Sequence, residues 1–146
     1  GKWYELTGEA SNYVIDQIPR WTTEAAQTFA ADFEERSGLT PSPSSAGLSY
    51  DGANFLIKVL ETTYRDYGEL NSESIYATKQ NKVWTGELTY SLDDGAIVMN
   101  EYNYSDPPDP LVGGEYYTFP ILQYIDGEAL AIWPDSFAEA ALQTKP

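Results

Sequence analysis

The 146-residue sequence contains no cysteine and no histidine. Without cysteine there is no disulfide and no thiolate chemistry, and without histidine there is no imidazole base and none of the usual zinc or copper ligands. Catalytic triads and dyads that depend on these residues are therefore excluded. The absence of cysteine does not identify a compartment, because a domain of this length can fold without disulfides.

Basic residues are scarce as well. Eight lysines and arginines accompany 23 acidic residues, which gives a formal net charge of -15 and a pI of about 4.1. A chain with this charge repels phosphate polymers and anionic lipid surfaces, so we expect no nucleic-acid partner. The simplest interpretation of the acidity is a solvated surface on an exported or salt-adapted protein, and a site for cations is the alternative.

Long apolar runs are also missing, since no stretch approaches the roughly 18 apolar residues of a membrane-spanning helix. The chain begins Gly1-Lys2-Trp3, without a signal peptide or an initiator methionine, which predicts a processed or excised piece with an upstream segment. The composition is nevertheless 42% hydrophobic and 14% aromatic, enough for a packed interior. We therefore expect a chain that folds as one unit.

The first half of the sequence predicts two extended segments followed by three helices. Residues 2–7 and 13–18 are short aromatic and β-branched stretches. The first helix is expected from an N-cap at Thr22 to a stop at Gly38, and a weaker helix over residues 72–82. Between them lies the strongest helix, which begins near Ser49 and carries an apolar stripe made of Ala53, Leu56, Val59, Leu60 and Tyr64.

The second half changes to a period of two. Residues 88–104 predict a hairpin that turns at Asp93-Asp94-Gly95, and residues 116–133 predict a second hairpin that turns at Asp126-Gly127. Residues 105–114 form a loop rich in proline, and residues 136–142 a short helix. The order of these elements predicts the mixed α/β class.

Pairs of carboxylates raise the possibility of a glycoside hydrolase. The candidate pairs are Asp93 with Asp94 and Asp106 with Asp109. Each pair lies in a turn beside glycine or proline, where aspartate is favoured because its side chain bonds the local backbone, so a structural role is preferred. The first pair does not belong to a calcium loop, because the alternating oxygen ligands and the closing glutamate are missing.

Aromatic residues offer an alternative from another class, a freestanding carbohydrate-binding or adhesion module. Its stacking platform would consist of Tyr102, Tyr104, Tyr116 and Trp133. Aromatic residues in strands usually pack in the core or against the neighbouring strand, which favours a structural role for them too.

Several short stretches occur together in a recognisable order. They are Gly8-Glu9-Ala10 leading into Tyr13-Val14-Ile15, the helix from Phe29 to Gly38 with Pro41 after it, Tyr50-Asp51-Gly52-Ala53, Phe119 to Tyr124, and Asp126-Gly127 followed by Ile132-Trp133-Pro134. In this order they resemble the C-terminal part of the type I periplasmic substrate-binding proteins of ABC transporters, particularly the branched-chain amino-acid (Leu/Ile/Val) group.

The resemblance implies the C-terminal portion of a two-lobed α/β fold, with helices packed on a mixed sheet and terminal β-hairpins. Residues 1–20 and 86–134 would supply strands of the second lobe and hinge, and residues 21–85 the helical part of the first lobe. Such proteins are non-catalytic receptors without a cofactor that hold a small, amino-acid-like solute between their lobes and deliver it to the ABC permease.

The same resemblance implies a periplasmic or extracellular location, with anchoring through an N-terminal lipoprotein signal that the sequence lacks. Because half of the cleft would be missing, we expect the chain alone to bind ligand weakly or not at all. Surfaces that absent lobes would cover predict self-association.

The resemblance also implies a binding site at the start of the strongest helix. In such folds the free backbone N–H groups and the dipole of a helix accommodate a carboxylate, so Ser44, Ser45, Ser49 and Tyr50 would line the cleft. The alternative is that Ser49 merely caps the helix while Asp51 offsets its dipole.

Overall fold

The computed structural model describes residues 3–116 and 118–145, so Lys2 and Tyr117, which two of the predicted strands include, lie outside the described residues. The chain forms two compact units, one made of residues 1–20 and 119–146 and the other of residues 21–118. Each unit combines helices with a small antiparallel sheet, which confirms the mixed α/β class. Residues 86–116 belong to the same unit as residues 21–85, whereas the sequence analysis grouped residues 86–134 with residues 1–20.

The sheet of the first unit has three antiparallel strands in the order β1 (Ile15–Gln17), β4 (Ile121–Ile125) and β5 (Glu128–Trp133). Strands β4 and β5 form the hairpin predicted around Asp126-Gly127. Both turn residues have positive φ angles, 50° and 88°, as a two-residue hairpin turn requires. The predicted hairpin is confirmed. It could be predicted because the Asp-Gly pair itself determines the backbone conformation of the turn.

The expected strand over residues 2–7 is wrong. Residues Trp3–Thr7 form a short helix, α1, which the Thr7 hydroxyl closes by donating to the carbonyl of Trp3 at 2.7 Å. A β-carbon placed on Gly127 would come within 3.0 Å of the Tyr4 ring, so this ring lies directly over the β4–β5 turn. The β propensity of the segment is not realised, because that propensity reflects pairing with a neighbouring strand.

The expected helix over residues 136–142 is also wrong. The Glu139 N–H donates to the carbonyl of Ala131 at 2.7 Å, and the Ala131 N–H donates to the Glu139 carboxylate. The buried Gln123 side chain exchanges two hydrogen bonds with the backbone of Gln143. The tail therefore bonds to the sheet instead of forming the internal hydrogen bonds of a helix.

In the second unit, α2 (Glu24–Ser37) is the first predicted helix, displaced by one residue at its start. Its N-cap is Thr23 rather than Thr22, and the Thr23 hydroxyl accepts the Ala26 N–H at 3.0 Å. The helix ends at Gly38 in the left-handed conformation, as predicted.

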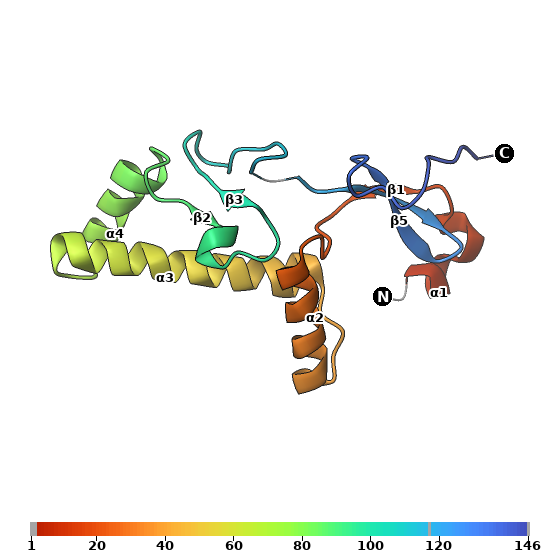
Figure 1. Cartoon of the computed structure of the whole chain (residues 1–146), viewed down its shortest axis with the longest axis horizontal. Helices are drawn as coiled ribbons and strands as arrows, with labels where there is room; N and C mark the ends of the chain where they lie inside the picture. The colour runs from red at the N-terminus through yellow and green to blue at the C-terminus, as the bar shows by residue number, and fades with distance from the viewer. Residues whose placement is uncertain (1–2, 117, 146) are drawn as a thin grey trace. The chain divides into compact units, whose positions relative to one another are not determined.

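Helix α3 (Leu48–Tyr67) runs the length of the second unit, with α2 near its N-terminal end and α4 (Ser72–Thr78) beside its C-terminal end (Figure 1). A π-helical turn, Lys79–Val83, continues α4 to one residue beyond the predicted end. The buried hydroxyls of Thr63 and Thr78 bond at 2.8 Å and tie the two helices together.

The buried face of α3 differs from the predicted apolar stripe. Its buried residues are Asp51, Phe55, Thr62 and Thr63, whereas Leu56 and Tyr64 of the stripe are 54% and 60% exposed. Ala53 is exposed as well, whereas Val59 and Leu60 are half-buried, so much of the stripe is an uncovered apolar surface. Helical periodicity identifies an amphipathic face but does not show whether the chain itself supplies the element that covers it.

The remaining segment of the second unit forms a two-stranded ladder, β2 (Tyr90–Ser91) with β3 (Glu101–Tyr102), so the first predicted hairpin exists in a shorter form. A 3-10 turn, Leu92–Asp94, follows β2. Residues 96–99 then leave the ladder and lie buried without regular structure. This segment is the centre of the unit's core.

Gly47, just before α3, provides a test of this packing. A β-carbon there would lie 2.6 Å from Val98 Cγ2 and 2.8 Å from Trp21 Cζ3. We expect Gly47→Ala to lower the free energy of unfolding by about 1–3 kcal/mol in a urea titration, because the core must shift to admit the methyl group.

Gly52 is the matched control, since a β-carbon on this helical glycine meets no atom within 4 Å. Gly52→Ala should raise the stability by up to about 1 kcal/mol, because alanine favours a helix. Equal unfolding midpoints for the two variants would contradict the packing described for residues 96–99.

Candidate functional site

The residues predicted to line a cleft lie in and after a π-helical turn, Pro43–Gly47, that leads directly into α3. Ser44, Ser45 and Ser49 are exposed, and Tyr50 is 41% exposed. The Ser44 hydroxyl lies 3.2 Å from that of Ser42. None of the three serines lines the hollows described below, whereas Tyr50 lines two of them.

The start of α3 does not offer the free N–H groups on which the predicted site depended. The amides of Ala46 and Gly47 both donate to the carbonyl of Ser42, and the amide of Leu48 donates to carbonyls within the π-helical turn. Ser49 lies inside the helix and is not its cap, because the cap position is Gly47 and has no side-chain bond. Helical hydrogen bonding begins several residues earlier than the sequence suggested.

Tyr50 is the predicted residue that does border a hollow. Its ring packs on Phe29 of α2, with ring centroids 4.9 Å apart. A hollow of about 240 Å³ between α2 and α3 is lined by these two rings, Phe33, Asp32 and Arg36. A second hollow of about 550 Å³ adjoins the same rings on the side of Glu24 and Ile97.

The hollow beside Tyr50 carries both signs of charge. Asp32 and Arg36 are four residues apart on α2, a spacing that places them on one helix face. Both are exposed, and neither forms an ion pair with another described side chain. An aromatic wall with an uncommitted carboxylate and guanidinium is complementary to a small zwitterion that has an apolar side chain.

Asp51 has a structural role that differs from the one the sequence suggested. Its carboxylate is fully buried and accepts the N–H groups of Ile97 and Val98 at 2.8 and 2.9 Å and the Tyr102 hydroxyl at 2.7 Å. These three bonds satisfy a charge for which the described part of the chain supplies no cationic partner. Asp51 therefore fastens α3 to the core segment instead of facing a ligand.

The tyrosines around Asp51 keep their protons. Burial raises the pKa of Tyr90 to about 12, and the Asp51 charge adds to the shift. Burial and the hydrogen bond to Asp51 raise the pKa of Tyr102 even further. Both folded-state pKa values exceed the usual tyrosine pKa of about 10. The contribution of the two protonated tyrosines to folding stability is therefore complete below about pH 10 and is lost as the pH rises through the folded-state values.

The aromatic platform proposed for a carbohydrate-binding module loses a member, because Tyr102 is buried. Phe55 packs against Tyr90, Tyr102 and Tyr104, with ring centroids 5.9, 6.5 and 6.1 Å away. Trp133 belongs to the other unit. The four rings form a packed cluster, which for Tyr90 and Tyr102 is the usual role of aromatic residues in strands.

The carboxylate pairs stay in turns. Asp94 accepts bonds from the backbone and the hydroxyl of Ser91 and forms an ion pair with Lys58 at 2.6 Å. Asp93, Asp106 and Asp109 are exposed. Among residues 3–116 and 118–145, no group of three or more acidic side chains is placed to hold a metal ion.

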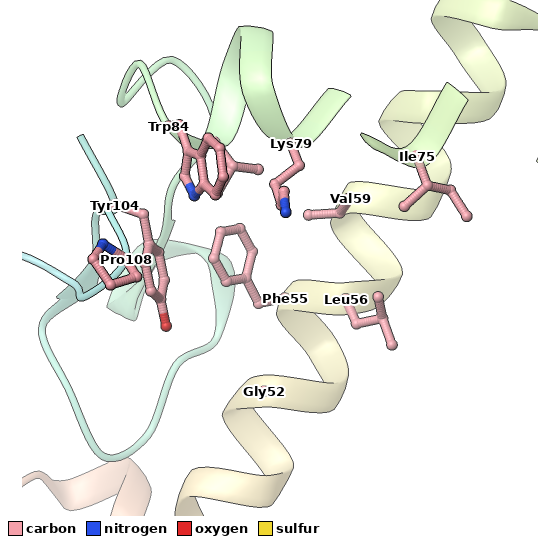
Figure 2. A pocket seen from close by; sticks show the side chains of 10 residues that line it. Gly52, Phe55, Leu56, Val59, Ile75, Lys79, Trp84, Tyr104 and Pro108 are labelled. Atoms are coloured by element: carbon pink, nitrogen blue, oxygen red, sulfur yellow. The ribbon is translucent and has the colours of Figure 1, made fainter. Parts of the chain in front are cut away.

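A groove that the sequence did not reveal lies along α3 and has a volume of about 500 Å³ (Figure 2). Figure 2 shows Phe55, Leu56 and Val59 of α3 on one side, with Lys79, Trp84 and Tyr104 facing them. The signal available was that Lys79 follows Ile75 and Tyr76 at helical spacing. The opposite wall is formed by segments distant in sequence, which periodicity cannot bring together.

No protein family, no curated protein and no solved structure matches the chain. None of the described helices has both the length and the apolar character needed to cross a membrane.

The Asp51 contacts predict a large effect of a small substitution. Asp51→Asn replaces one acceptor oxygen by an N–H₂ group that faces the donors on Ile97, Val98 and Tyr102. We expect a loss of about 3 kcal/mol in the free energy of unfolding, because buried donors lose a charged acceptor. Urea denaturation followed by circular dichroism measures this loss.

The control is Asp93→Asn, which removes the same charge from an exposed residue of a turn. Its effect should stay within about 0.5 kcal/mol. If both substitutions had the same effect, net charge rather than the buried carboxylate would set the stability.

Proposed function

We propose that this chain is the C-terminal part of a type I periplasmic-binding-protein-like receptor that delivers a small, amino-acid-like solute to an ABC permease outside the cytoplasm. It performs no chemistry and needs no cofactor. The observation that carries the proposal is the hollow beside Tyr50, where aromatic rings and both signs of charge meet. The ordered motifs of the sequence support the same assignment.

The hollow suits the three parts of an amino acid. The guanidinium of Arg36 would bind the α-carboxylate, the carboxylate of Asp32 the α-ammonium, and the rings of Phe29, Phe33 and Tyr50 the apolar side chain. Both charged groups are exposed, so each contact is weak in this chain alone. A second lobe that closed over the hollow would exclude water and strengthen the contacts.

The connectivity of the two units also supports a two-lobed receptor. The chain passes from the first unit to the second between Arg20 and Trp21 and returns between Thr118 and Phe119. A polypeptide that forms a hinged clamp makes crossings of this kind. The exposed apolar stripe of α3 supports self-association of the isolated chain, which light scattering on the samples below would reveal.

Titration of the chain with leucine, isoleucine, valine and phenylalanine, followed by NMR, tests the proposal. We expect saturable shifts at Tyr50, Phe29 and Arg36, with dissociation constants on the order of 1 mM because a single open wall contributes. Tyr50→Ala and Arg36→Gln should abolish the shifts.

The matched controls are Tyr64→Ala, an exposed tyrosine of the same helix, and Arg65→Gln, which like Arg36 lies in the last turn of a helix. Neither should change binding. Because the hollow narrows the expectation for this chain alone to weak binding, absence of shifts near Tyr50 at tens of millimolar ligand, or turnover of any substrate tested, would refute the proposed function.

A further inference from the structure

The groove along α3 is a separate hollow with a chemistry of its own. Its volume of about 500 Å³ lies in the range typical of small-molecule sites. It shares no residue with the hollow beside Tyr50. Gly52 at one end leaves it open, since a β-carbon there would meet no described atom within 4 Å apart from its chain neighbours and the helix's own backbone.

The walls of the groove are apolar and aromatic. Leu56 and Val59 form the side on α3, and the rings of Phe55, Trp84 and Tyr104 lie around the centre (Figure 2). Leu56 is 54% exposed, so its surface is free to contact a ligand. An apolar body placed here would bury surface on several sides.

Lys79 supplies the single positive charge of the lining. Its Nζ lies 4.3 Å from the centroid of the Trp84 ring and 4.5 Å from that of Tyr76, so two rings hold the ammonium in place. It forms no ion pair within the described part of the chain. Lys82, three residues later, binds both Asp66 and Glu87.

The unpaired ammonium of Lys79 indicates that the ligand carries a negative charge. The net charge of -15 opposes the approach of anions, so charge alone would not hold a strongly hydrated anion such as phosphate. The apolar walls would also leave most oxygens of a multiply charged group unpaired. A ligand that brings its own apolar surface and a single negative charge meets both conditions.

We propose that the groove binds an organic monocarboxylate, with its apolar or aromatic body against Phe55, Leu56 and Val59 and its carboxylate on the ammonium of Lys79. Among the described residues that line the groove there is no aspartate or glutamate, so an α-ammonium group finds no carboxylate partner there and would be repelled by the ammonium of Lys79. The groove therefore selects acids without an amino group, and its ligand differs from the amino-acid-like solute of the proposed function. This inference does not depend on the proposed function.

Four probes that differ in one group each test the inference on the full chain by calorimetry. They are 3-phenylpropionate, its neutral amide, phenylalanine and acetate. We expect saturable binding of 3-phenylpropionate in the groove, about five- to tenfold weaker binding of the amide because the ion pair is lost, and no measurable binding of acetate. Phenylalanine should leave the NMR signals of Trp84 and Leu56 unchanged.

Substitutions test whether the carboxylate of 3-phenylpropionate binds to Lys79. Lys79→Met keeps the aliphatic stem and should weaken 3-phenylpropionate about five- to tenfold while leaving the amide unaffected. Lys145→Met, which removes the same charge from the exposed C-terminal tail, should leave both probes unchanged. Circular dichroism confirms that each variant is folded, and the comparison of acid with amide in the unmodified chain needs no variant.

The inference is overturned if 3-phenylpropionate does not saturate, if acid and amide bind equally, or if phenylalanine shifts the same groove signals to the same extent. Because the two sites have no residue in common, loss of shifts at Tyr50 with retention at Trp84 would separate failure of the proposed function from failure of this inference.

Discussion

The second unit depends on one buried carboxylate. Asp51 is surrounded by protein, has no cationic partner among the described residues and is satisfied by two backbone amides and one tyrosine hydroxyl. A buried charge is tolerated only where such donors are fixed in place, so the carboxylate determines the path of residues 96–99. Thr23 adds a bond from its hydroxyl to the carbonyl of Ile97, which links α2 to the same segment.

This constraint explains how α3 positions the hollow beside Tyr50 and the groove. The core segment, residues 96–99, covers the Asp51 face of the helix. Val98 of this segment and Trp21 lie against Gly47, just before the helix. Of the basic side chains in the second unit, Lys58, Arg65 and Lys82 form ion pairs, whereas Arg36 and Lys79 do not. These two unpaired cations each line a hollow, which is why the charge pattern points to anionic groups on ligands.

Features that depend on local chemistry could be predicted from the sequence. Gly38 ends α2, and Asp126-Gly127 forms a hairpin turn, because each sets its own backbone conformation. Residues 3–7 and the tail around Glu139 could not, because contacts with distant residues override their local preference. Periodicity found α3 but not its buried face, since pattern alone does not show which neighbour is present. Tyr50 was recognisable beside a helix start. Lys79 and Trp84 are close in sequence, but only the fold brings them next to α3 and Tyr104.

Native-state amide hydrogen exchange measured by NMR tests the central claim most directly. Ile97 and Val98 belong to no helix or strand, and yet their N–H groups are buried and bonded to Asp51. The account predicts that these two amides exchange as slowly as those in the middle of α3. Exchange as fast as in the exposed loop that contains Asp106, with α3 still protected, would show that the carboxylate does not hold the core together.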